Sequence, residues 1–425
     1  MTVLRECTGP ERDADDVAQL WQFARQRGMD RERFEAALSD GGLSAALAAC
    51  MDLAGPADQR EDQEVSGETK STAENWFKDT SPFVAHDNGR CLEARLEHMQ
   101  GVITPTNLFF VRNNSVSLDV QPDTWQLSIE GDAVREPLTL SYADILALPS
   151  RTVVAYLDCA GNQRAMFDLV NGESTEGTQW RTGGVSNGEW VGTPLRDVLT
   201  MAGIGDDAVC VMLVGLDTES PEEGFRSVIP VEKAMHPDTL LAYALNGETL
   251  PRDHGYPLRA LVPGWVGSTN VKWLGQIVVS SKPIWTRNNT TSYVLIGDEY
   301  PAEGKAQGQV THCQVIKSAL ALPWPADLRA EPHRIHGYAH SPDGPISRVE
   351  WSLDSGATWQ KATLHSPQVQ YSWARFEFAW DPAPGSYTIM TRATDDAGNS
   401  QPDAIPFNAK GYLFNQPIPH PVRVT

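Results

Sequence analysis

The sequence predicts an α+β chain: a small helical N-terminal extension, a mixed α/β domain and a C-terminal β-sandwich of immunoglobulin type. Three observations predict this order. Apolar residues recur at helical spacing near the N-terminus, short β-rich runs then alternate with brief helix signals, and from about residue 308 only strand-like runs remain. A chain of 425 residues is long enough for two or three domains. We place the domains at residues 1–75, 76–305 and 306–425.

The N-terminal extension is acidic and helical in pattern over residues 13–54. Its first set of apolar residues at helical spacing is Val17, Leu20, Trp21 and Ala24. A second pattern, RERFEAALSDGG, stops at a pair of glycines, and residues 55–75 have almost nothing to bury and read as a linker. Residues 1–75 hold 16 acidic and 8 basic side chains, a net charge of −8. We interpret the extension as a packed appendage, with a partner-binding module as the alternative.

The middle of the chain has the sequence pattern of a mixed α/β domain. Its strand-like runs are TWQLSIEG, RTVVAYLDC, AVCVMLVGLD, PLRALVPGW and VKWLGQIVVS. Helix signals are brief, as in SYADILALP and PLRDVLTMAG, which is too little helix for a regular doubly wound sheet. Ser141 and Thr193 stand near the predicted helix starts, where a hydroxyl can accept from unpaired N–H groups.

The C-terminal part contains strand-like runs split by Asp, Ser, Gly and Pro, which is typical of a sandwich. They are RIHGYAHS, ISRVEWSLD, TWQKATLHS, SWARFEFAW and GSYTIMTRATD. Within them, SLDSGATW predicts a hairpin, with Ser355 and Gly356 as its turn residues.

Composition narrows the classes of function. The formal net charge of −21 argues against nucleic-acid and anionic-membrane partners. The six cysteines form no CxxC pair, which fits a reduced compartment. Apolar runs stay below the 18 or so residues of a membrane span, and the start has no basic segment followed by an apolar core. We expect a cytoplasmic protein, or a periplasmic one if a leader lies outside this sequence.

The stretch AYLDCAGNQRAMF places a thiol, Cys159, just after a predicted strand and a permanent cation, Arg164, five residues later. A buried structural thiol is the common fate of a lone cysteine. A nearby arginine favours the thiolate, which is both a nucleophile and a ligand for soft metals. From these residues alone, structural thiol, nucleophile and metal ligand all stay open.

Two further stretches carry cations beside apolar sequence. In residues 250–275, His254, Arg259 and Lys272 are separated by Gly and Pro, an arrangement that suits a phosphate-bearing ligand. The alternative is a solvated basic loop, which the apolar run RALVPGWVG argues against. In NLFFVRNNS, Arg112 ends an aromatic strand, where it either faces a ligand or reaches solvent.

Taken together, these motifs resemble the sulfite oxidase family of molybdenum enzymes. The matching motifs, over roughly residues 100–415, are FFVRN (109–113), CAGNQR (159–164), QWRTGGVSNGEWVGTPLRDVL (179–199), GLD (215–217), LPRDHGYPLR (250–259) and VKWLG (271–275). The run VEWSLDSGATWQKATL (349–364) is similar to the immunoglobulin-like dimerisation domain of that family. The resemblance therefore implies a molybdopterin-binding middle domain and a homodimer formed through the C-terminal domain.

The resemblance also implies roles for individual residues. Cys159 would ligate the molybdenum of a molybdopterin that carries no appended nucleotide. The implied cofactor-binding residues are Phe110, Arg112, Asn113, Cys159, Asp217, His254, Arg259, Asn270, Val271 and Lys272. The implied substrate-binding residues are Arg112, Arg164, Trp180 and Arg375, and the implied catalytic residues are Cys159, Tyr293, Arg112 and Arg164.

The implied reaction is oxidation of sulfite to sulfate by oxo transfer, with electrons passed to a separate acceptor such as a cytochrome or oxygen. We expect no haem, because the sequence has neither CxxCH nor a His-Pro-Gly-Gly signature. Two departures keep other sulfur compounds or oxyanions open, namely sulfane sulfur, a sulfoxide or nitrate. Asn114 stands where animal and plant members have His, and Gln163 where they have Arg. A non-catalytic binding protein of the same fold is the alternative from another class.

Overall fold

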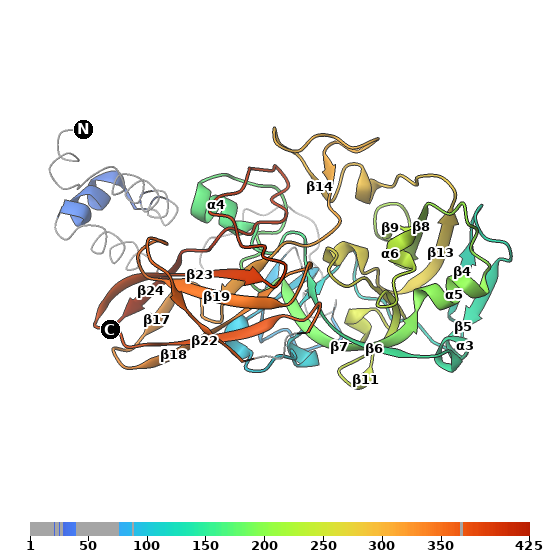
Figure 1. Cartoon of the computed structure of the whole chain (residues 1–425), viewed down its shortest axis with the longest axis horizontal. Coiled ribbons are helices and arrows are strands. Elements are labelled where there is room, and N and C mark those ends of the chain that lie inside the picture. The colour runs from blue at the N-terminus through green and yellow to red at the C-terminus, as the bar shows by residue number, and fades with distance from the viewer. Residues whose placement is uncertain (1–20, 22–24, 26–28, 40–75, 87–88, 366–368) are drawn as a thin grey trace, which may run out of the picture.

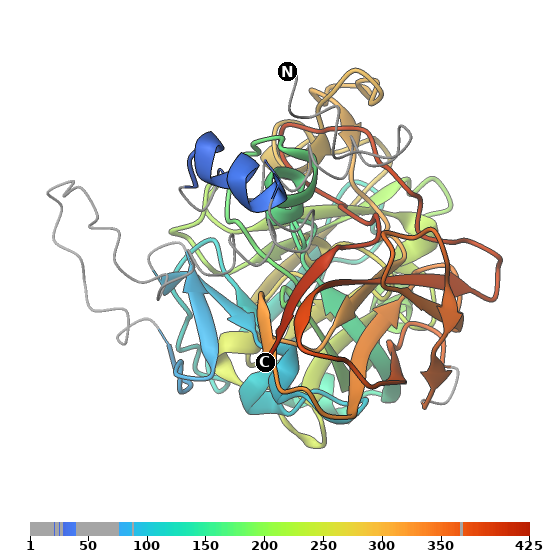
Figure 2. The same cartoon turned by 90° about the vertical axis from the view of Figure 1, so that its left-hand side faces the viewer.

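The computed structural model describes residues 21, 25, 29–39, 76–86, 89–365 and 369–425. Residues 31–39 are helical, as the second N-terminal pattern predicts, and Arg33 N donates to Asp30 Oδ1 at 2.8 Å to cap the first turn. Phe34 is buried with its ring centroid 5.2 Å from that of Trp21. Figures 1 and 2 place this helix at the end of the molecule that holds the C-terminal sheets. The predicted helical positions Val17, Leu20 and Ala24 and the predicted linker 55–75 lie outside the described residues.

Three sheets build the middle of the chain. The smallest has the order β1 (Phe83–His86), β2 (Cys91–Ala94), β3 (Val111–Arg112). A second has the order β11 (Glu248–Thr249), β10 (Leu240–Leu245), β7 (Val185–Pro194), β6 (Arg151–Asp158), with β12 (Arg259–Leu261) also paired to β10. The third has the order β5 (Leu138–Ser141), β4 (Gln126–Glu130), β13 (Leu274–Ser280), β8 (Cys210–Gly215), β9 (Arg226–Pro230). Only β4 and β13 in this third sheet run parallel, so neighbours are mostly antiparallel.

The helices of this part are short: α3 (Tyr142–Ala147), α4 (Ala165–Asn171), α5 (Leu195–Met201) and α6 (Val231–Ala234). Three of them, α3, α5 and α6, flank the middle sheets, whereas α4 packs against the chain that follows β23 (Figure 1). The predicted cap at Ser141 is confirmed, because Ser141 and Asp144 form a reciprocal capping box. The expectation for Thr193 is wrong. Pro194, the last residue of β7, is also the N-cap of α5, and the Thr193 hydroxyl donates to Ile145 O at 3.4 Å. Apolar side chains of α3, α5 and the third sheet share one buried core.

Two further sheets form the C-terminal part. One has the order β16 (Lys317–Leu320), β18 (His333–His340), β22 (Ala374–Trp380), β21 (Thr363–Leu364). The other has the order β17 (Ala326–Leu328), β24 (His420–Val424), β23 (Gly385–Asp395), β19 (Ile346–Ser352), β20 (Gln360–Lys361). Both contribute to a single core, as in the stacking of Trp351 on Phe378 at 4.3 Å, so they are two layers around shared apolar side chains. The immunoglobulin type of this two-layer arrangement stays a prediction.

The predicted hairpin at SLDSGATW is confirmed. Strands β19 and β20 pair antiparallel, and Ser355 (φ 55°) and Gly356 (φ 85°) take the left-handed backbone of the turn. A second hairpin, β14 (Val294–Leu295) with β15 (Gln309–Val310), spans the predicted domain boundary at 305/306. That boundary stays a prediction. Within the part of the chain that the structure describes, no helix is both long and apolar enough to cross a membrane.

Candidate functional site

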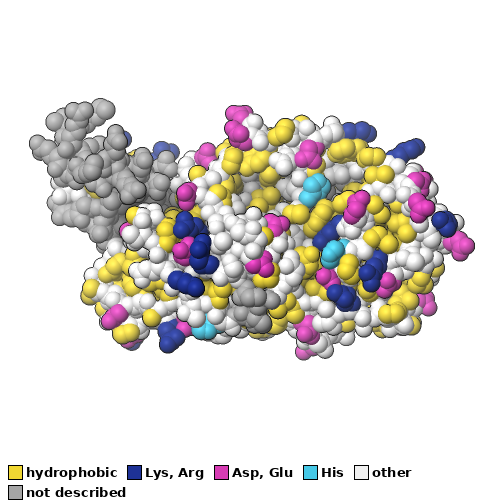
Figure 3. All heavy atoms as spheres, viewed as in Figure 1, with side chains coloured by type: hydrophobic (Ala, Val, Ile, Leu, Met, Phe, Trp, Pro, Cys, Tyr) yellow, Lys and Arg dark blue, Asp and Glu magenta, His cyan; other side chains and the backbone are white. Residues whose placement is uncertain are grey.

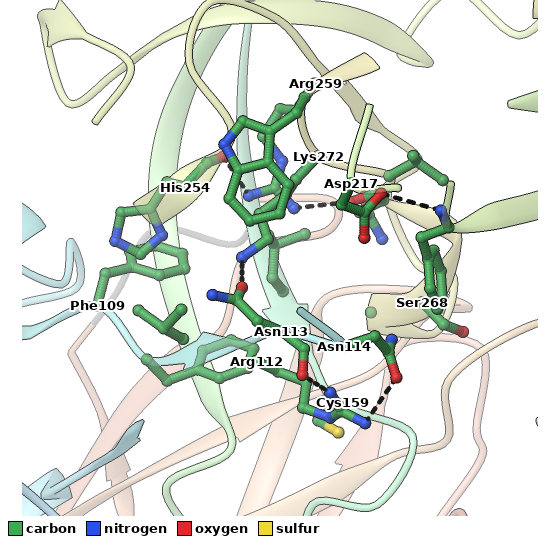
Figure 4. A pocket seen from close by; sticks show the side chains of 18 of the residues that line it. Phe109, Arg112, Asn113, Asn114, Cys159, Asp217, His254, Arg259, Ser268 and Lys272 are labelled. Carbon is green, nitrogen blue, oxygen red and sulfur yellow. Dashed lines mark hydrogen bonds between the residues drawn. The ribbon is translucent and has the colours of Figure 1, made fainter. Parts of the chain in front are cut away.

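One pocket collects the ends of elements that are far apart in the sequence (Figure 4). It receives the end of β3, the turn after β6, the loop after β8, the η6 turn (Arg252–His254), and the stretch from the η7 turn (Gly267–Thr269) to β13. The predicted site residues that line it are Phe110, Arg112, Asn113, Cys159, Asp217, His254, Arg259, Asn270, Val271, Lys272 and Tyr293. Figure 4 shows Cys159 and Arg112 at one end and His254, Arg259 and Lys272 at the other.

The thiol end is held by backbone bonds around the turn that follows β6. Cys159 N donates to Gly184 O at 2.9 Å, and Gly184 N donates to Asn162 Oδ1 at 3.0 Å. The Cys159 side chain is buried, and burial raises the pKa of its thiol, while the charges of Arg112 and Arg164 oppose that rise. The thiol is therefore neutral in the bare pocket, and a bound metal ion would supply the positive charge that ionises it.

Arg112 supplies a fixed positive charge beside this thiol. Burial by itself lowers the pKa of Arg112, but the nearby Tyr293, Cys91 and Cys159 more than offset it, so that the pKa is raised. One of its terminal nitrogens donates to Asn113 O and the other to Asn114 Oδ1 at 3.2 Å (Figure 4). The amide of Asn114, at the position where the sequence departs from animal and plant members, thus orients the guanidinium.

Two tyrosines stack at the same end of the pocket. The rings of Tyr293 and Tyr412 are 5.5 Å apart and nearly parallel, at 12°. Tyr293 has φ 50°, a left-handed backbone that is unfavourable for a tyrosine, and Thr311 holds it through two bonds to Tyr293 O at 2.9 and 2.7 Å. Burial raises the pKa of Tyr412 to about 12, so its hydroxyl stays a neutral donor at physiological pH.

The opposite end is a cluster of desolvated cations. Arg259 donates to His254 O at 2.9 Å and to Asn270 O at 3.0 Å. Lys272 donates to Asp253 O at 2.9 Å and to Asn113 Oδ1. Burial lowers the pKa of Arg259 to about 9 and that of Lys272 to about 7, and it holds the pKa of His254 well below its usual value. Their partners here are neutral carbonyl oxygens, which do not balance the charge, so this end is suited to an anion.

Comparison with known proteins places this pocket in a family. The family model described as "Oxidoreductase molybdopterin binding domain" matches residues 113–287, and "Mo-co oxidoreductase dimerisation domain" matches residues 311–423. Sulfite oxidase of Gallus gallus is 34% identical over 352 residues, which cover 78% of this chain and 74% of that protein. The chain belongs to the sulfite oxidase family of molybdopterin oxidoreductases.

Further relatives include a second sulfite oxidase and two proteins named for other substrates. Mitochondrial sulfite oxidase of Mus musculus is 34% identical over 74% of this chain, and the chain spans 60% of the length of that relative. Nitrate reductase [NADH] 1 of Arabidopsis thaliana is 29% identical over 81% of this chain and 41% of that protein. The crystal structure of the sulfane dehydrogenase SoxCD from Paracoccus pantotrophus superposes with a TM-score of 0.70 at 28% identity, covering 82% of this chain and 89% of that one.

The pocket fits the cofactor of this family at both ends. The desolvated Arg259 and Lys272 suit the phosphate of a molybdopterin, since buried cations need an anion to be stable in their charged form. Asp217, whose carboxylate accepts from Phe225 N at 2.9 Å, offers further acceptor positions for the N–H groups of a pterin ring. Cys159 offers a soft ligand for the metal at the far end.

Three predicted site residues are not among those that line the pocket. Arg164 donates hydrogen bonds to Lys410 O and to Thr178 O, both at 2.9 Å, and its guanidinium lies 4.9 Å from the ring centre of Tyr412. Trp180 is fully buried behind the pocket wall, edge-on to Phe110 at 6.2 Å. Arg375 lies in β22 and pairs with Glu377 at 3.3 Å. Their contact with the substrate stays a prediction.

Two residues that contact predicted site residues from outside the pocket lining, Tyr412 and Lys78, were not predicted from the sequence. Tyr412 comes from the irregular chain after β23, more than 100 residues beyond Tyr293, and its one local signal is the preceding Gly411 with φ 60°. Lys78 contacts His254 from the segment that follows the polar linker, where the aromatic pair Trp76-Phe77 marks the return of residues able to pack. Neither belongs to a motif with a chemical signature.

The pH dependence of stability offers a test of the basic end. In the unfolded chain Lys272 titrates near its usual pKa of 10.5, and in the folded protein near 7. Between these values the unfolded state binds more protons, so the free energy of unfolding of cofactor-free protein rises with pH. We expect urea titrations to show a rise of up to about 1 kcal/mol per pH unit between pH 7 and 9.5. Bound phosphate should flatten this rise, and so should Lys272→Met; equal slopes in all three samples would contradict the assignment.

Proposed function

We propose that the chain catalyses the molybdenum-dependent oxidation of sulfite to sulfate and passes the electrons to a separate acceptor such as a cytochrome or oxygen. The observation that supports this most directly is the two-ended pocket, with a single thiol and a fixed cation opposite a cluster of desolvated cations. In the proposal, the cofactor is molybdopterin without an appended nucleotide, and the chain carries no haem. When bound, the cofactor supplies the two-electron oxo transfer.

The chain's own residues bind and orient the two reactants. His254, Arg259 and Lys272 would hold the cofactor phosphate, and Asp217 and Asn270 would bind the pterin. Their neighbours Phe110, Asn113 and Val271 complete the walls of the cofactor site. The Cys159 thiolate fixes the metal end. Arg112 and Tyr293, which line the same pocket as Cys159, would then face the substrate.

At the substrate end, Arg112 attracts the anion and Tyr293 donates a neutral hydrogen bond. A guanidinium keeps its charge at any physiological pH and matches the oxygens of sulfite and sulfate. A second full cation would hold the product sulfate more tightly and slow its release. A neutral phenol donates a hydrogen bond without this effect. Arg164 acts from behind Tyr412, where its charge still favours the Cys159 thiolate.

The acidic exterior does not prevent an anion from entering. The net charge is −21, yet exposed charges are screened beyond about 8–10 Å at physiological salt. Figure 3 shows acidic side chains spread over the outline of one face, with Lys and Arg gathered in smaller groups. A recessed cation such as Arg112 can therefore dominate the field at the site.

A second candidate substrate is a sulfane sulfur compound. It is favoured by the likeness to a structure named sulfane dehydrogenase at a TM-score of 0.70. The name nitrate reductase among the relatives keeps nitrate in the test panel. A sulfoxide is the remaining alternative within the family, and a binding protein without turnover is the alternative outside it.

One experiment separates these readings. Full-length protein from a molybdate-replete host is analysed for molybdenum and pterin, and turnover is followed with sulfite, thiosulfate, nitrate or a sulfoxide. Cytochrome c, ferricyanide and oxygen serve as acceptors for the oxidations, and a reduced viologen serves as donor for the reductions. We expect about one molybdenum per chain and fastest turnover with sulfite. Faster turnover with another compound would show that compound to be the substrate in place of sulfite. Absence of molybdenum would favour a non-catalytic binding protein.

We also propose that residues 306–425 form a dimerisation domain, that the protein is a homodimer, and that residues 76–305 form the catalytic domain. The match of residues 311–423 to a dimerisation-domain model supports this division. Light scattering on the full chain would test the homodimer. The proposed location is the cytoplasm, or the periplasm if a leader precedes this sequence.

Substitution of Arg112 by Gln tests the substrate end. Loss of a charge-assisted contact of about 1.5–3 kcal/mol should raise the KM for sulfite by roughly 10- to 100-fold, with a smaller fall in kcat. Steady-state kinetics at several salt concentrations measure this, and the salt dependence of KM should weaken in the variant. Arg181→Gln is the matched control, because Arg181 is exposed and donates to Trp324 O. An unchanged KM in Arg112→Gln would remove Arg112 from substrate binding.

A further inference from the structure

The segment 76–79, which precedes β1, is fixed against the basic end of the pocket. Phe77 N donates to both carboxylate oxygens of Asp253, at 3.1 and 3.3 Å. The guanidinium of Arg252 lies 5.0 Å from the ring centre of Phe77. Both contacts reach the η6 turn at the residues just before His254, and Asp253 is itself buried. Backbone and ring thus attach this segment to the turn that presents His254 to the pocket.

The next residue, Lys78, contacts His254 directly. Lys78 Nζ lies 2.8 Å from Phe109 O, 3.3 Å from Thr106 O and 3.2 Å from His254 Nε2. An ammonium has three protons and no lone pair, so these three acceptors use its full donor capacity. It follows that His254 Nε2 accepts, and that the proton of the neutral imidazole is on Nδ1.

The neutral form of His254 agrees with its surroundings. Burial, together with the charges of Lys78, Lys272 and Arg259, holds the pKa of His254 well below its usual value. Phe109 packs edge-on against the imidazole, with centroids 5.3 Å apart, and restrains the ring on another side. A neutral histidine could carry its proton on either nitrogen, and Lys78 selects one of the two.

We propose that residues 76–79 are a clasp on the phosphate end of the cofactor pocket, in which Lys78 positions His254 as an Nδ1–H donor toward the cofactor. The proposal rests on the proposed function for the identity of the cofactor. Because all three protons of Lys78 are used by the protein, Lys78 acts through His254 and is a positioning residue. The clasp links the start of the middle domain to cofactor retention, so a disturbance at residues 76–79 should loosen the cofactor without touching Cys159 or Arg112.

The test is the rate at which loaded, full-length protein loses its cofactor. Purified wild type and Lys78→Met are diluted, and molybdopterin that remains with the protein is measured over time as its fluorescent oxidation product. Loss of a charge-assisted bond should make release about 10- to 100-fold faster. Lys78→Arg, which keeps a cationic donor, should recover part of the retention. Lys361→Met is the control, since Lys361 is an exposed lysine in β20.

A second readout reports the tautomer, which a merely structural lysine would leave unchanged. In protein labelled with ¹⁵N-histidine, His254 Nε2 should resonate as an unprotonated nitrogen in wild type and as a mixture in Lys78→Met, with His254→Asn giving the assignment. If Lys78→Met fails to fold, Lys78→Gln keeps a similar stem and a neutral donor, and it should show the same direction of change.

The outcomes are distinct from those for the proposed function. Wild-type protein that contains no molybdopterin would overturn the proposed function. Wild type that contains it, with equal release from Lys78→Met and an unchanged His254 tautomer, would overturn the clasp alone. Faster release with an unchanged tautomer would also overturn the positioning role of Lys78.

Discussion

Cys159→Ser is expected to lose turnover by at least about 10³-fold while it keeps its pterin, because in the proposed function the Cys159 sulfur would ligate the reacting metal. A serine hydroxyl is a harder ligand than a thiolate and ionises with much more difficulty, so it is a poor substitute on a soft metal. The cofactor should stay, since His254, Arg259 and Lys272 line the opposite end of the pocket and would hold its phosphate in the proposed function. Sulfite turnover, molybdenum content and pterin content are measured on the same preparation.

The control for this substitution is Cys313→Ser, which changes an exposed thiol. It should leave turnover and cofactor content unchanged. Full activity in Cys159→Ser would rule out Cys159 as the metal ligand. Loss of pterin together with turnover would contradict the division of the pocket into two independently held ends, provided that thermal unfolding shows the variant to be folded.

The fold was predictable from the sequence where local chemistry decides it. Ser141, three residues before Asp144, is a capping box that needs no distant partner, and it forms as predicted. At Thr193 a stronger local rule applied. Pro194, which has no N–H and a fixed φ, ends β7 and occupies the N-cap of α5, so Thr193 lies one residue too early to cap the helix.

The site residues that belong to recognisable motifs could be predicted from the sequence. The residues that reach the site through packing between distant segments could not. The resemblance implies that Arg164 binds the substrate, whereas its place five residues after Cys159 indicates only that it favours the thiolate. In the structure Arg164 fits among Gly161, Gly177 and Gly411, where an added Cβ would come within 3 Å of its side-chain atoms. Gly411 lies about 250 residues away in the sequence, so no local pattern could show that its turn receives this guanidinium. Tyr412 enters the site for the same reason.

The turn of Cys159 also depends on a buried ion pair from the C-terminal sheets. Asp158, immediately before Cys159, has no measurable exposure, and Lys317 of β16 donates to its Oδ2 at 3.0 Å and to Asn162 O at 3.3 Å. His340 Nε2 lies 3.6 Å from the same carboxylate oxygen. Burial raises the pKa of Asp158 to about 6, and Lys317 opposes that rise. The ion pair therefore compensates a carboxylate that has no access to water.

Lys317→Met is expected to lower the free energy of unfolding by about 3–5 kcal/mol, because it leaves Asp158 buried without a counterion. Urea denaturation of wild type and variant with equal cofactor content measures this loss. The matched double variant, Asp158→Asn with Lys317→Met, removes both charges and should recover part of the stability, since a neutral amide needs no counterion. If the single and double variants are equally unstable, the loss comes from packing around Lys317 and not from the unpaired carboxylate. A single variant as stable as wild type would show that Asp158 reaches another partner.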